Sequence, residues 1–300
     1  MRLAEFREFA KGKNKMAIKV ITDSTSYIDK SLREELGITL VSLSVNFEDE
    51  SFRETDIDNE TFFKKMQEKG IPKSSQPTVS EVYEAMHDAV KDGDSLVCVF
   101  ISSDMSGTFS TAHIAKEMVL ETIKDAEIEI IDSRSNSMQL GYAAIVAARA
   151  AREGRSMLEI VQIVEDNKKR SRFLFVPDTL EYLKKGGRIG GASALIGSLL
   201  KIIPILTVEE GKTEMLMKVR TKQKAVETMV GKVMEDIEEF GLGEISVHHI
   251  NCFEEASRLA ELLKGKLKTE VGICNIGPVI GLHVGPGALG IVYYTLRNRK

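Results

Sequence analysis

Residues 95–108 read SLVCVFISSDMSGT, an apolar run that passes directly into a loop of serines, an aspartate and a glycine. Ser95–Ile101 is apolar after its first position, which is typical of a strand covered by helices on both faces of a parallel sheet. Ser106 or Thr108 begins a predicted helix that reaches about Leu120. This succession of strand, polar loop and helix indicates an α/β fold.

The same unit occurs on both sides of this stretch. Ala17–Thr22 forms a short apolar strand that ends in the polar loop Asp23–Ser26. Ile128–Ile131 forms another strand, and Asp132–Ser137 leads from it into an Ala-rich helix that extends to about Arg152. Repeated units of this kind predict a mainly parallel sheet for the first half of the chain.

The other elements are predicted from apolar periodicity and from helix caps. Strands are expected at 38–47, 172–176, 202–208, 215–219, 245–250, 271–276 and 289–294. Helices are expected at 58–69, 79–90, 156–169, 179–183, 221–239 and 253–264, with a further apolar helix that ends at Leu200. Because the second half adds a hairpin to its helix-linked strands, we expect two α/β domains. Residues 16–165 would contain a mainly parallel sheet, and residues 166–300 a mixed sheet.

Composition and charge argue against several classes of protein. The chain has 300 residues, of which 43% are hydrophobic and 29% are charged, as in ordinary globular proteins. No apolar run approaches the ~20 residues that cross a bilayer. Residues 16–296 hold 33 basic and 43 acidic residues, a net charge of −10, which argues against nucleic-acid binding. Residues 1–15 have no continuous apolar segment, so we expect a disordered tail or an added extension rather than a secretory signal, with Met16 as a second plausible start.

Cysteines and metal-binding motifs are sparse. Cys98, Cys252 and Cys274 are widely spaced, which argues against a disulfide framework or a zinc site and indicates a reducing, cytoplasmic compartment. The sequence has no His-Glu-x-x-His, Cys-x-x-Cys or clustered-aspartate motif, so no metal is expected. Asp23 and Asp132 each follow a strand. A catalytic carboxylate pair is conceivable there, but capping of their own loops explains both residues better.

Glycines and small hydroxyl residues concentrate in four loops, several of them at the carboxyl ends of strands, where open α/β sheets bind ligands. These loops are Ser74–Thr78, Ser102–Thr108, Lys184–Gly191 and Gly277–Gly290. An ordinary turn or helix cap explains each of them about as well as a binding role. Backbone amides with the hydroxyls of Ser74, Ser75 and Ser106 could receive an anion, and Gly107 would let a ligand approach the backbone.

The last three loops suggest different roles. Ser102–Thr108 lacks the lysine of a Walker A loop, and the chain has no Gly-x-Ser-x-Gly elbow of the kind found in serine hydrolases. The third loop adjoins the stretch 168–188, whose net charge of +5 suits an acidic partner or a phosphate. In the fourth, His283 lies among glycines and prolines and could donate to a carboxylate. The other four histidines lie on predicted helices or on a strand, where structural roles are expected.

Five motifs in this order resemble the DegV family over residues 17–296. They are Val20–Thr25, Ser74–Thr78, Ile101–Thr108 with Met105 where leucine is usual, Leu180–Ile189, and His283–Ala288. The resemblance implies two α/β domains that hold a long-chain fatty acid in a buried apolar tunnel between them. It implies no cofactor besides this ligand.

The resemblance also implies which residues meet the ligand. The hydroxyls of Ser74 and Ser106 and the imidazole of His283 would bind the carboxylate. Relatives often have threonine in place of Ser74, and serine keeps the hydrogen-bond donor. The possible additional residues of the pocket are Ser75, Gly107 and Gly285.

Some members of the family are similar to the carrier subunit of bacterial fatty acid kinase, in which a separate ATP-binding subunit phosphorylates the bound carboxylate for phospholipid synthesis. The resemblance therefore implies a cytoplasmic, non-enzymatic carrier with at most transient membrane contact, in which Arg188 and Arg220 dock the kinase subunit. The alternative is a hydrolase or acyl transferase with Ser106 as nucleophile and His283 as base. The sequence supplies no third group to orient that histidine.

Overall fold

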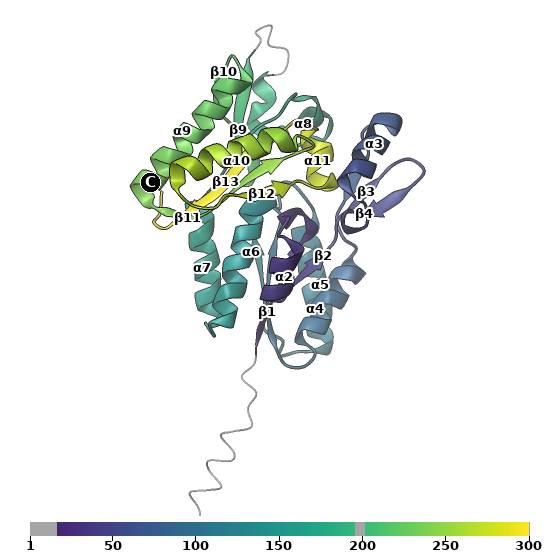
Figure 1. Cartoon of the computed structure of the whole chain (residues 1–300). Coiled ribbons are helices and arrows are strands. Elements are labelled where there is room, and N and C mark those ends of the chain that lie inside the picture. Colours follow the sequence, from purple (N-terminus) through teal and green to yellow (C-terminus); the bar gives the residue numbers. More distant parts are fainter. Residues whose placement is uncertain (1–16, 196–201, 300) are drawn as a thin grey trace, which may run out of the picture.

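A parallel sheet organises the first half of the chain in the computed structural model, which describes residues 17–195 and 202–299 (Figure 1). Its strand order is β2-β1-β6-β7, with the bounds Ile38–Val41, Ile18–Asp23, Ser95–Phe100 and Ile128–Asp132. All neighbouring strands of this sheet pair in parallel. Every residue of β6 is buried, as predicted from its continuous apolar sequence.

Helices cover both faces of this sheet. They are α2 (Lys30–Leu36), α4 (Val79–Val90), α5 (Thr108–Thr122), α6 (Ser137–Arg152) and α7 (Met157–Arg170). Leu96 and Cys98 of β6 belong to one apolar cluster with α4 and α5, whereas Val97 and Val99 belong to another with α6 and α7. The alternation of side chains along one strand therefore explains why its sequence is apolar at every position after Ser95.

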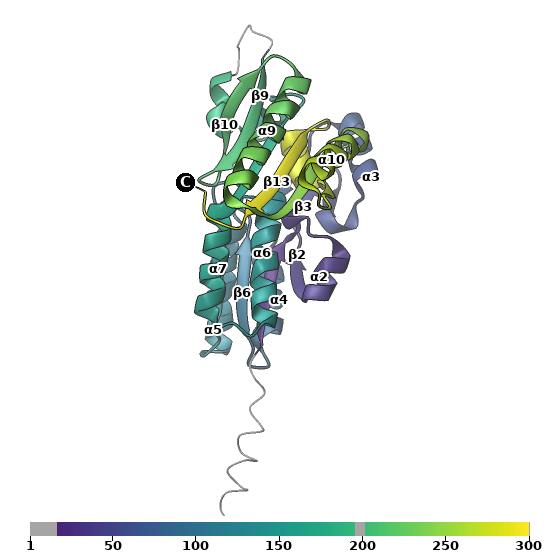
Figure 2. The ribbon, with the colours of Figure 1, turned by 60° about the vertical axis from the view of Figure 1, so that its left-hand side comes forward.

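A mixed six-stranded sheet organises the second half, in the order β10-β9-β8-β13-β11-β12. The bounds are Lys212–Val219, Ile203–Glu209, Ser171–Val176, Leu289–Thr295, Leu242–His249 and Gly272–Asn275. β11 and β12 pair in parallel and the other neighbours pair antiparallel, so the predicted mixed sheet is confirmed. α9 (Lys222–Phe240) and α10 (Phe253–Leu267) cover one face of it (Figure 2).

The other face of the second sheet turns toward the first half of the chain. Phe173 and Phe175 of β8 belong to the same apolar cluster as Leu140 of α6. α7 leads directly into β8, and the domain boundary expected near residue 165 falls within this helix. None of the described helices is long and apolar enough to cross a membrane.

The strand predicted at 38–47 is in fact two strands in different sheets. β2 ends at Val41, and β3 (Ser44–Asn46) belongs to a small antiparallel sheet with β4 (Ser51–Arg53) and β5 (Lys73–Ser75). The chain changes direction at Leu43, whose N–H donates to the hydroxyl of Ser24 at 3.1 Å and whose carbonyl accepts the N–H of Glu54 at 2.9 Å. These bonds to distant residues replace the ladder that the alternating sequence predicted.

Two predicted loops also contain regular structure. β5 overlaps the start of the predicted loop Ser74–Thr78, and the glycine-rich stretch Gly277–Gly290 contains the helix α11 (Pro278–Val284). α3 (Asn59–Lys69) is capped by Asp58 as expected. The predicted helix at 179–183 is displaced to α8 (Glu181–Lys185), and a 3-10 helix occupies Gly190–Leu195. The remainder of the apolar helix predicted to end at Leu200, and the tail predicted at 1–15, lie outside the described residues.

Candidate functional site

A cavity of about 320 Å³ lies where the carboxyl ends of β6 and β7 face the second sheet. Its volume falls in the ~300–1,000 Å³ range of small-molecule sites. The apolar part of its wall includes Leu43, Ile101, Phe173, Phe175, Leu183, Val208, Ile250, Ile276, Val279, Ile280 and Leu289. Both halves of the chain contribute to this wall, so the cavity depends on their contact.

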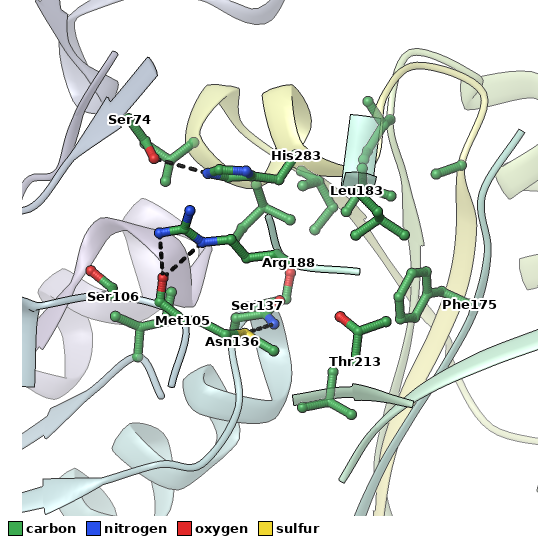
Figure 3. Close-up of a pocket in the computed structure, with 18 of the residues that line it drawn as sticks. Ser74, Met105, Ser106, Asn136, Ser137, Phe175, Leu183, Arg188, Thr213 and His283 are labelled. Atoms are coloured by element: carbon green, nitrogen blue, oxygen red, sulfur yellow. Dashed lines mark hydrogen bonds between the residues drawn. The ribbon is translucent and has the colours of Figure 1, made fainter. Parts of the chain in front are cut away.

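One wall of the cavity carries a hydroxyl–imidazole pair. The Oγ of Ser74, on β5, lies 2.9 Å from the Nε2 of His283, in the last turn of α11 (Figure 3). Burial and then the nearby positive charge of Arg188 lower the pKa of His283 from 6.5 to about 4. The imidazole is therefore neutral near pH 7 and has one proton to donate.

The loop after β6 brings a second hydroxyl to the cavity. Ser106 lines it and lies with its Oγ 2.9 Å from the Oγ1 of Thr108. Next to it, Gly107 packs against Gln76, because a Cβ at Gly107 would lie 2.0 Å from the Oε1 of Gln76. Two of the predicted loops therefore meet directly, and this glycine is needed for their close packing.

Glycines also let α8 pack against α11. A Cβ at Gly186 would lie 2.2 Å from the Nδ1 of His283, and a Cβ at Gly285 would lie 2.3 Å from the ring of Tyr182. Gly285 ends α11 with a φ of 87°, a conformation that favours glycine. The third and fourth predicted loops are thus in contact.

Most of the residues predicted for the site line this one cavity. They are Ser74, Ser75, Ser106, Gly107, Arg188 and His283. Gly285 supports the packing of α11 instead, and Arg220 is an exposed residue directly after β10. The hydrogen bond of His283 goes to Ser74, whereas Ser106 bonds to Thr108, so the described residues give no Ser106–His283 dyad for a hydrolase.

Arg188 connects the loops of the two halves beside the cavity. Its Nε and Nη2 donate to the carbonyl of Met105 at 3.2 and 3.1 Å (Figure 3). Its Nη1 donates to the carbonyl of Gly186 at 2.6 Å. The residue is nevertheless exposed. Its guanidinium is therefore accessible to a partner and at the same time part of the cavity wall.

The positively charged stretch 168–188 does not form one free surface. Arg172 turns inward and lies 3.0 Å from the carboxylate of Asp236. Lys168 pairs with Glu165 on the same helix at 2.7 Å. Among the charged residues of this stretch, Arg188 lines the cavity, so the local net charge in the sequence overstates the patch.

Asp23 and Asp132 hold their own loops, as the better of the two interpretations predicted. Asp23 accepts the N–H of Thr25 at 2.9 Å, and Asp132 accepts the N–H of Arg134 at 2.8 Å. Across 17–195 and 202–299, no three His, Cys, Asp or Glu side chains are grouped so that they could hold a metal ion.

The polar residues of the wall that were not predicted from the sequence include Asn136, Ser137, Thr213, His248 and His249. His248 was expected to have only a structural role. It is buried, and burial together with His249 lowers its pKa to about 3. The polar loop Asp132–Ser137 was a signal for Asn136 and Ser137. It follows β7, and the loop after the neighbouring strand β6 contains Ser106.

The geometry suits an amphiphile with a small polar or anionic head. Neutral donors from Ser74, Ser106 and His283 gather in one part of the wall, and apolar side chains make up most of the remainder. Such donors can bind an anion without neutralising its charge.

Comparison with known proteins gives consistent matches over nearly the whole chain. A family model described as "Uncharacterised protein, DegV family" matches residues 17–296. A DegV domain-containing protein of Clostridium acetobutylicum is 64% identical over 285 residues, which cover 95% of this chain and 100% of that protein.

Solved structures of family members also match this fold over nearly the whole chain. DegV of Bacillus subtilis, described as a fatty acid binding protein, is 34% identical with a TM-score of 0.83, and the match covers 93% of this chain and 99% of that one. A stearic acid-binding protein of Eubacterium ventriosum is 26% identical with a TM-score of 0.84, over 93% and 98% of the two chains.

Proposed function

This chain belongs to the DegV family, and we propose that it binds a long-chain fatty acid in the cavity between its two sheets. The hydroxyls of Ser74 and Ser106 donate to the carboxylate, His283 orients the hydroxyl of Ser74, and the acyl tail lies along the apolar wall. The observation that carries the proposal is the Ser74–His283 pair, 2.9 Å apart in the wall of a largely apolar cavity. The fatty acids bound by structurally similar family members support it.

The tail supplies most of the binding free energy in this proposal. At ~0.8 kcal/mol per buried methylene, a 16-carbon chain contributes roughly 10 kcal/mol before the cost of association is subtracted. Side chains such as Phe173, Phe175 and Val208 offer the apolar surface that such a chain needs. The contacts of the head group then mainly set the orientation of the ligand and contribute less to its affinity.

The hydroxyl–imidazole pair explains how neutral donors receive the carboxylate. Nδ1 of His283 lies beside Gly186 and has no hydrogen-bond partner in the described parts of the chain. We therefore assign the imidazole proton to Nε2, which donates to the Oγ of Ser74. The hydroxyl proton of Ser74 is then free to donate to the carboxylate, beside the hydroxyl of Ser106.

We further propose that the bound carboxylate is presented to a separate ATP-dependent kinase subunit. The sequence has no Walker A lysine and no protein-kinase signature set, so the nucleotide would have to come from a partner. Neutral donors leave the carboxylate nucleophilic, as phosphorylation requires. Arg188 and Arg220 are both exposed and are the proposed contacts of that partner.

Mass spectrometry of solvent extracts from the purified protein tests the proposed ligand directly. The delipidated protein is then titrated with palmitate and stearate, with Ser80→Ala as a matched control because Ser80 is an exposed serine on α4. We expect a co-purified fatty acid, saturable binding, weaker binding by Ser106→Ala, and unchanged binding by the control.

The same preparation tests the hydrolase alternative. Wild type and Ser106→Ala are assayed with a long-chain p-nitrophenyl ester. Ester turnover that depends on Ser106, together with an empty cavity and no fatty acid binding, would overturn the proposal.

A further inference from the structure

The cavity wall contains a second group of polar side chains, separate from the proposed head-group residues. Asn136, Ser137 and Thr213 line the cavity and are 6%, 0% and 4% exposed, respectively. Asn136 and Ser137 lie at the start of α6, and the hydroxyl of Thr213, on β10, points toward them (Figure 3). Both halves of the chain therefore place polar atoms at one part of the wall.

Two of these side chains have unsatisfied hydrogen-bonding groups. Neither the Oγ of Ser137 nor the Oδ1 of Asn136 has a hydrogen-bond partner among residues 17–195 and 202–299. Asn136 makes one contact through its other side-chain atom, with Nδ2 3.1 Å from the sulfur of Met105. Buried polar groups in native proteins are nearly always paired, so both atoms indicate that something polar occupies the space in front of them.

The backbone supports the same interpretation. Ser137 has a φ of 54°, in the left-handed region that residues other than glycine rarely adopt. Asn136 occupies the N-cap position of the 16-residue helix α6 without capping it through its side chain. Strained residues at a helix start persist where the surroundings hold them in place, and they are found at ligand sites more often than elsewhere. Together these residues form a built polar subsite rather than an ordinary cap.

The chemistry of the subsite selects a neutral group that both donates and accepts. The Oδ1 of Asn136 only accepts hydrogen bonds, so it would repel a second carboxylate or a phosphate. The hydroxyls of Ser137 and Thr213 can accept or donate. A saturated hydrocarbon chain would leave the Oδ1 of Asn136 and the Oγ of Ser137 unpaired, at a cost to binding.

We propose, resting on the fatty-acid binding proposed above, that the preferred ligand is a fatty acid with a hydroxyl group on its chain. That hydroxyl donates to Asn136 and accepts from Ser137 or Thr213. The carboxylate stays with Ser74, Ser106 and His283. The subsite thus converts a general fatty-acid cavity into one that recognises oxygenated chains.

Competition titration of the delipidated protein tests this inference. The probes are stearic acid and a series of hydroxystearic acids that differ only in the position of the hydroxyl. We expect one isomer to bind about tenfold tighter than stearic acid, which is the usual net gain from satisfying buried hydrogen-bonding groups. In Thr213→Val and Ser137→Ala, the ratio of the two affinities falls toward one. Thr122→Val, on an exposed residue of α5, keeps the wild-type ratio.

The outcomes separate this inference from the function on which it rests. If stearic acid binds and no hydroxystearic acid is preferred, the hydroxyl subsite is wrong, ordered water fills it, and the fatty-acid proposal stands. If neither kind of acid binds, both proposals fail. If one isomer is preferred but Thr213→Val and Ser137→Ala keep the full preference, its hydroxyl binds elsewhere and this assignment is overturned.

Discussion

The carboxylate of Glu54 accepts the backbone N–H of Val279 at 2.8 Å and thereby holds the start of the helix that carries His283. Gly277, at the N-cap position of α11, has no side chain with which to cap it. Glu54 also accepts the hydroxyl of Tyr27 at 2.7 Å, and that hydroxyl in turn accepts the N–H of Ile280 at 3.2 Å. Residues from the first half of the chain therefore supply the missing cap and set the orientation of α11.

Glu54→Gln should weaken both folding and ligand binding. The amide keeps one acceptor but places an NH₂ group where the carboxylate accepts the hydroxyl of Ser24 at 2.5 Å. We expect the free energy of unfolding to fall by about 1–3 kcal/mol, the cost of a mismatched buried hydrogen bond. Fatty-acid affinity should fall with it, because α11 positions His283. Denaturant unfolding and titration measure the two effects.

Glu121→Gln is the matched control for this substitution, since Glu121 is exposed on α5. It should change neither stability nor affinity. Wild-type values for Glu54→Gln would mean that α11 keeps its position without this carboxylate.

Buried carboxylates also predict a pH dependence of stability. Burial raises the pKa of Glu54 from 4.5 to about 7 and that of Asp23 from 3.8 to about 6. The folded state therefore binds these protons more tightly than the unfolded state, and the free energy of unfolding falls as pH rises from about 4 to about 7. The Glu54 contribution is at most about 3 kcal/mol.

Histidine burial acts in the opposite direction. Because the pKa of His283 is lowered to about 4, its contribution to stability is lost as pH falls from 6.5 toward 4. The free energy of unfolding should therefore be measured between about pH 4 and pH 7. Glu54→Gln should reduce the loss of stability that wild type shows as pH rises toward 7, and it should leave unchanged the loss of stability as pH falls toward 4. Parallel curves for wild type and Glu54→Gln would contradict the assignment of this titration to Glu54.

The head-group residues should act together, and the hydrogen-bonded pair Ser74 and His283 should show this most directly. Ser74→Ala, Ser106→Ala and His283→Ala are each expected to weaken fatty-acid binding by about 1–3 kcal/mol. Since Ser74 and His283 are 2.9 Å apart and hydrogen-bonded, their double mutant should lose less than the sum of the single losses. Titration of the four proteins of this cycle measures the coupling, and strict additivity would mean that the pair does not act on one carboxylate.

The sequence predicted correctly those helices and strands that have both a clear apolar pattern and clear residues at their ends. β6 is apolar after Ser95 because Leu96 faces α4 and α5 while Val97 faces α6, and a continuous apolar run of this kind indicates a buried strand. The strand at 38–47 was wrong because alternation continues across Leu43, although the bonds of that residue to Ser24 and Glu54 turn the chain into another sheet. Those partners are distant in sequence, so no local pattern reports them.

Site residues that belong to a sequence motif could be predicted, whereas residues that only the tertiary packing brings to the cavity could not. α11 was missed because its glycines suggested a loop, although Pro278 in the first turn and Gly285 after the end are ordinary start and stop signals. His248 was expected to be structural because strand histidines usually are. Its place in the cavity depends on how the second sheet docks on the first half, which the sequence does not report.

Gly186→Ala tests the position of the imidazole without changing it chemically. The backbone at Gly186 is ordinary for alanine, with a φ of −75°, but the new Cβ would lie 2.2 Å from the Nδ1 of His283. The ring must therefore move, and affinity should fall by about as much as in His283→Ala. In a His283→Ala background, Gly186→Ala should have little further effect, because the ring is gone.

Gly231→Ala is the control for this prediction. Gly231 lies inside α9, and a Cβ there has nothing within 4 Å among the described residues. Alanine should stabilise the helix by about 0.5–1 kcal/mol and leave the affinity unchanged. If Gly186→Ala behaves like Gly231→Ala, the proposed contact between α8 and the imidazole is wrong.

The two proposed kinase contacts differ in whether a substitution would also disturb the cavity. Arg188 is exposed but also bonds to the carbonyls of Met105 and Gly186 in the cavity wall, so Arg188→Ala should change ligand exchange as well as docking. Arg220 is exposed and is not part of that wall. It is therefore the better probe of a partner surface.

Arg220→Ala should slow acyl-phosphate formation in a reconstituted assay with ATP, a kinase subunit and the loaded protein. Exposed charges at the rim of an interface mainly set the encounter rate and its salt dependence, so the mutant should also respond less to ionic strength than wild type. Lys232→Ala controls for loss of a positive charge on another part of the second half. Fatty-acid affinity should stay at the wild-type value in Arg220→Ala, because the residue does not line the cavity. An unchanged rate at low and high salt would remove Arg220 from the partner surface, and acyl phosphate made by this chain alone would show that no kinase partner is needed.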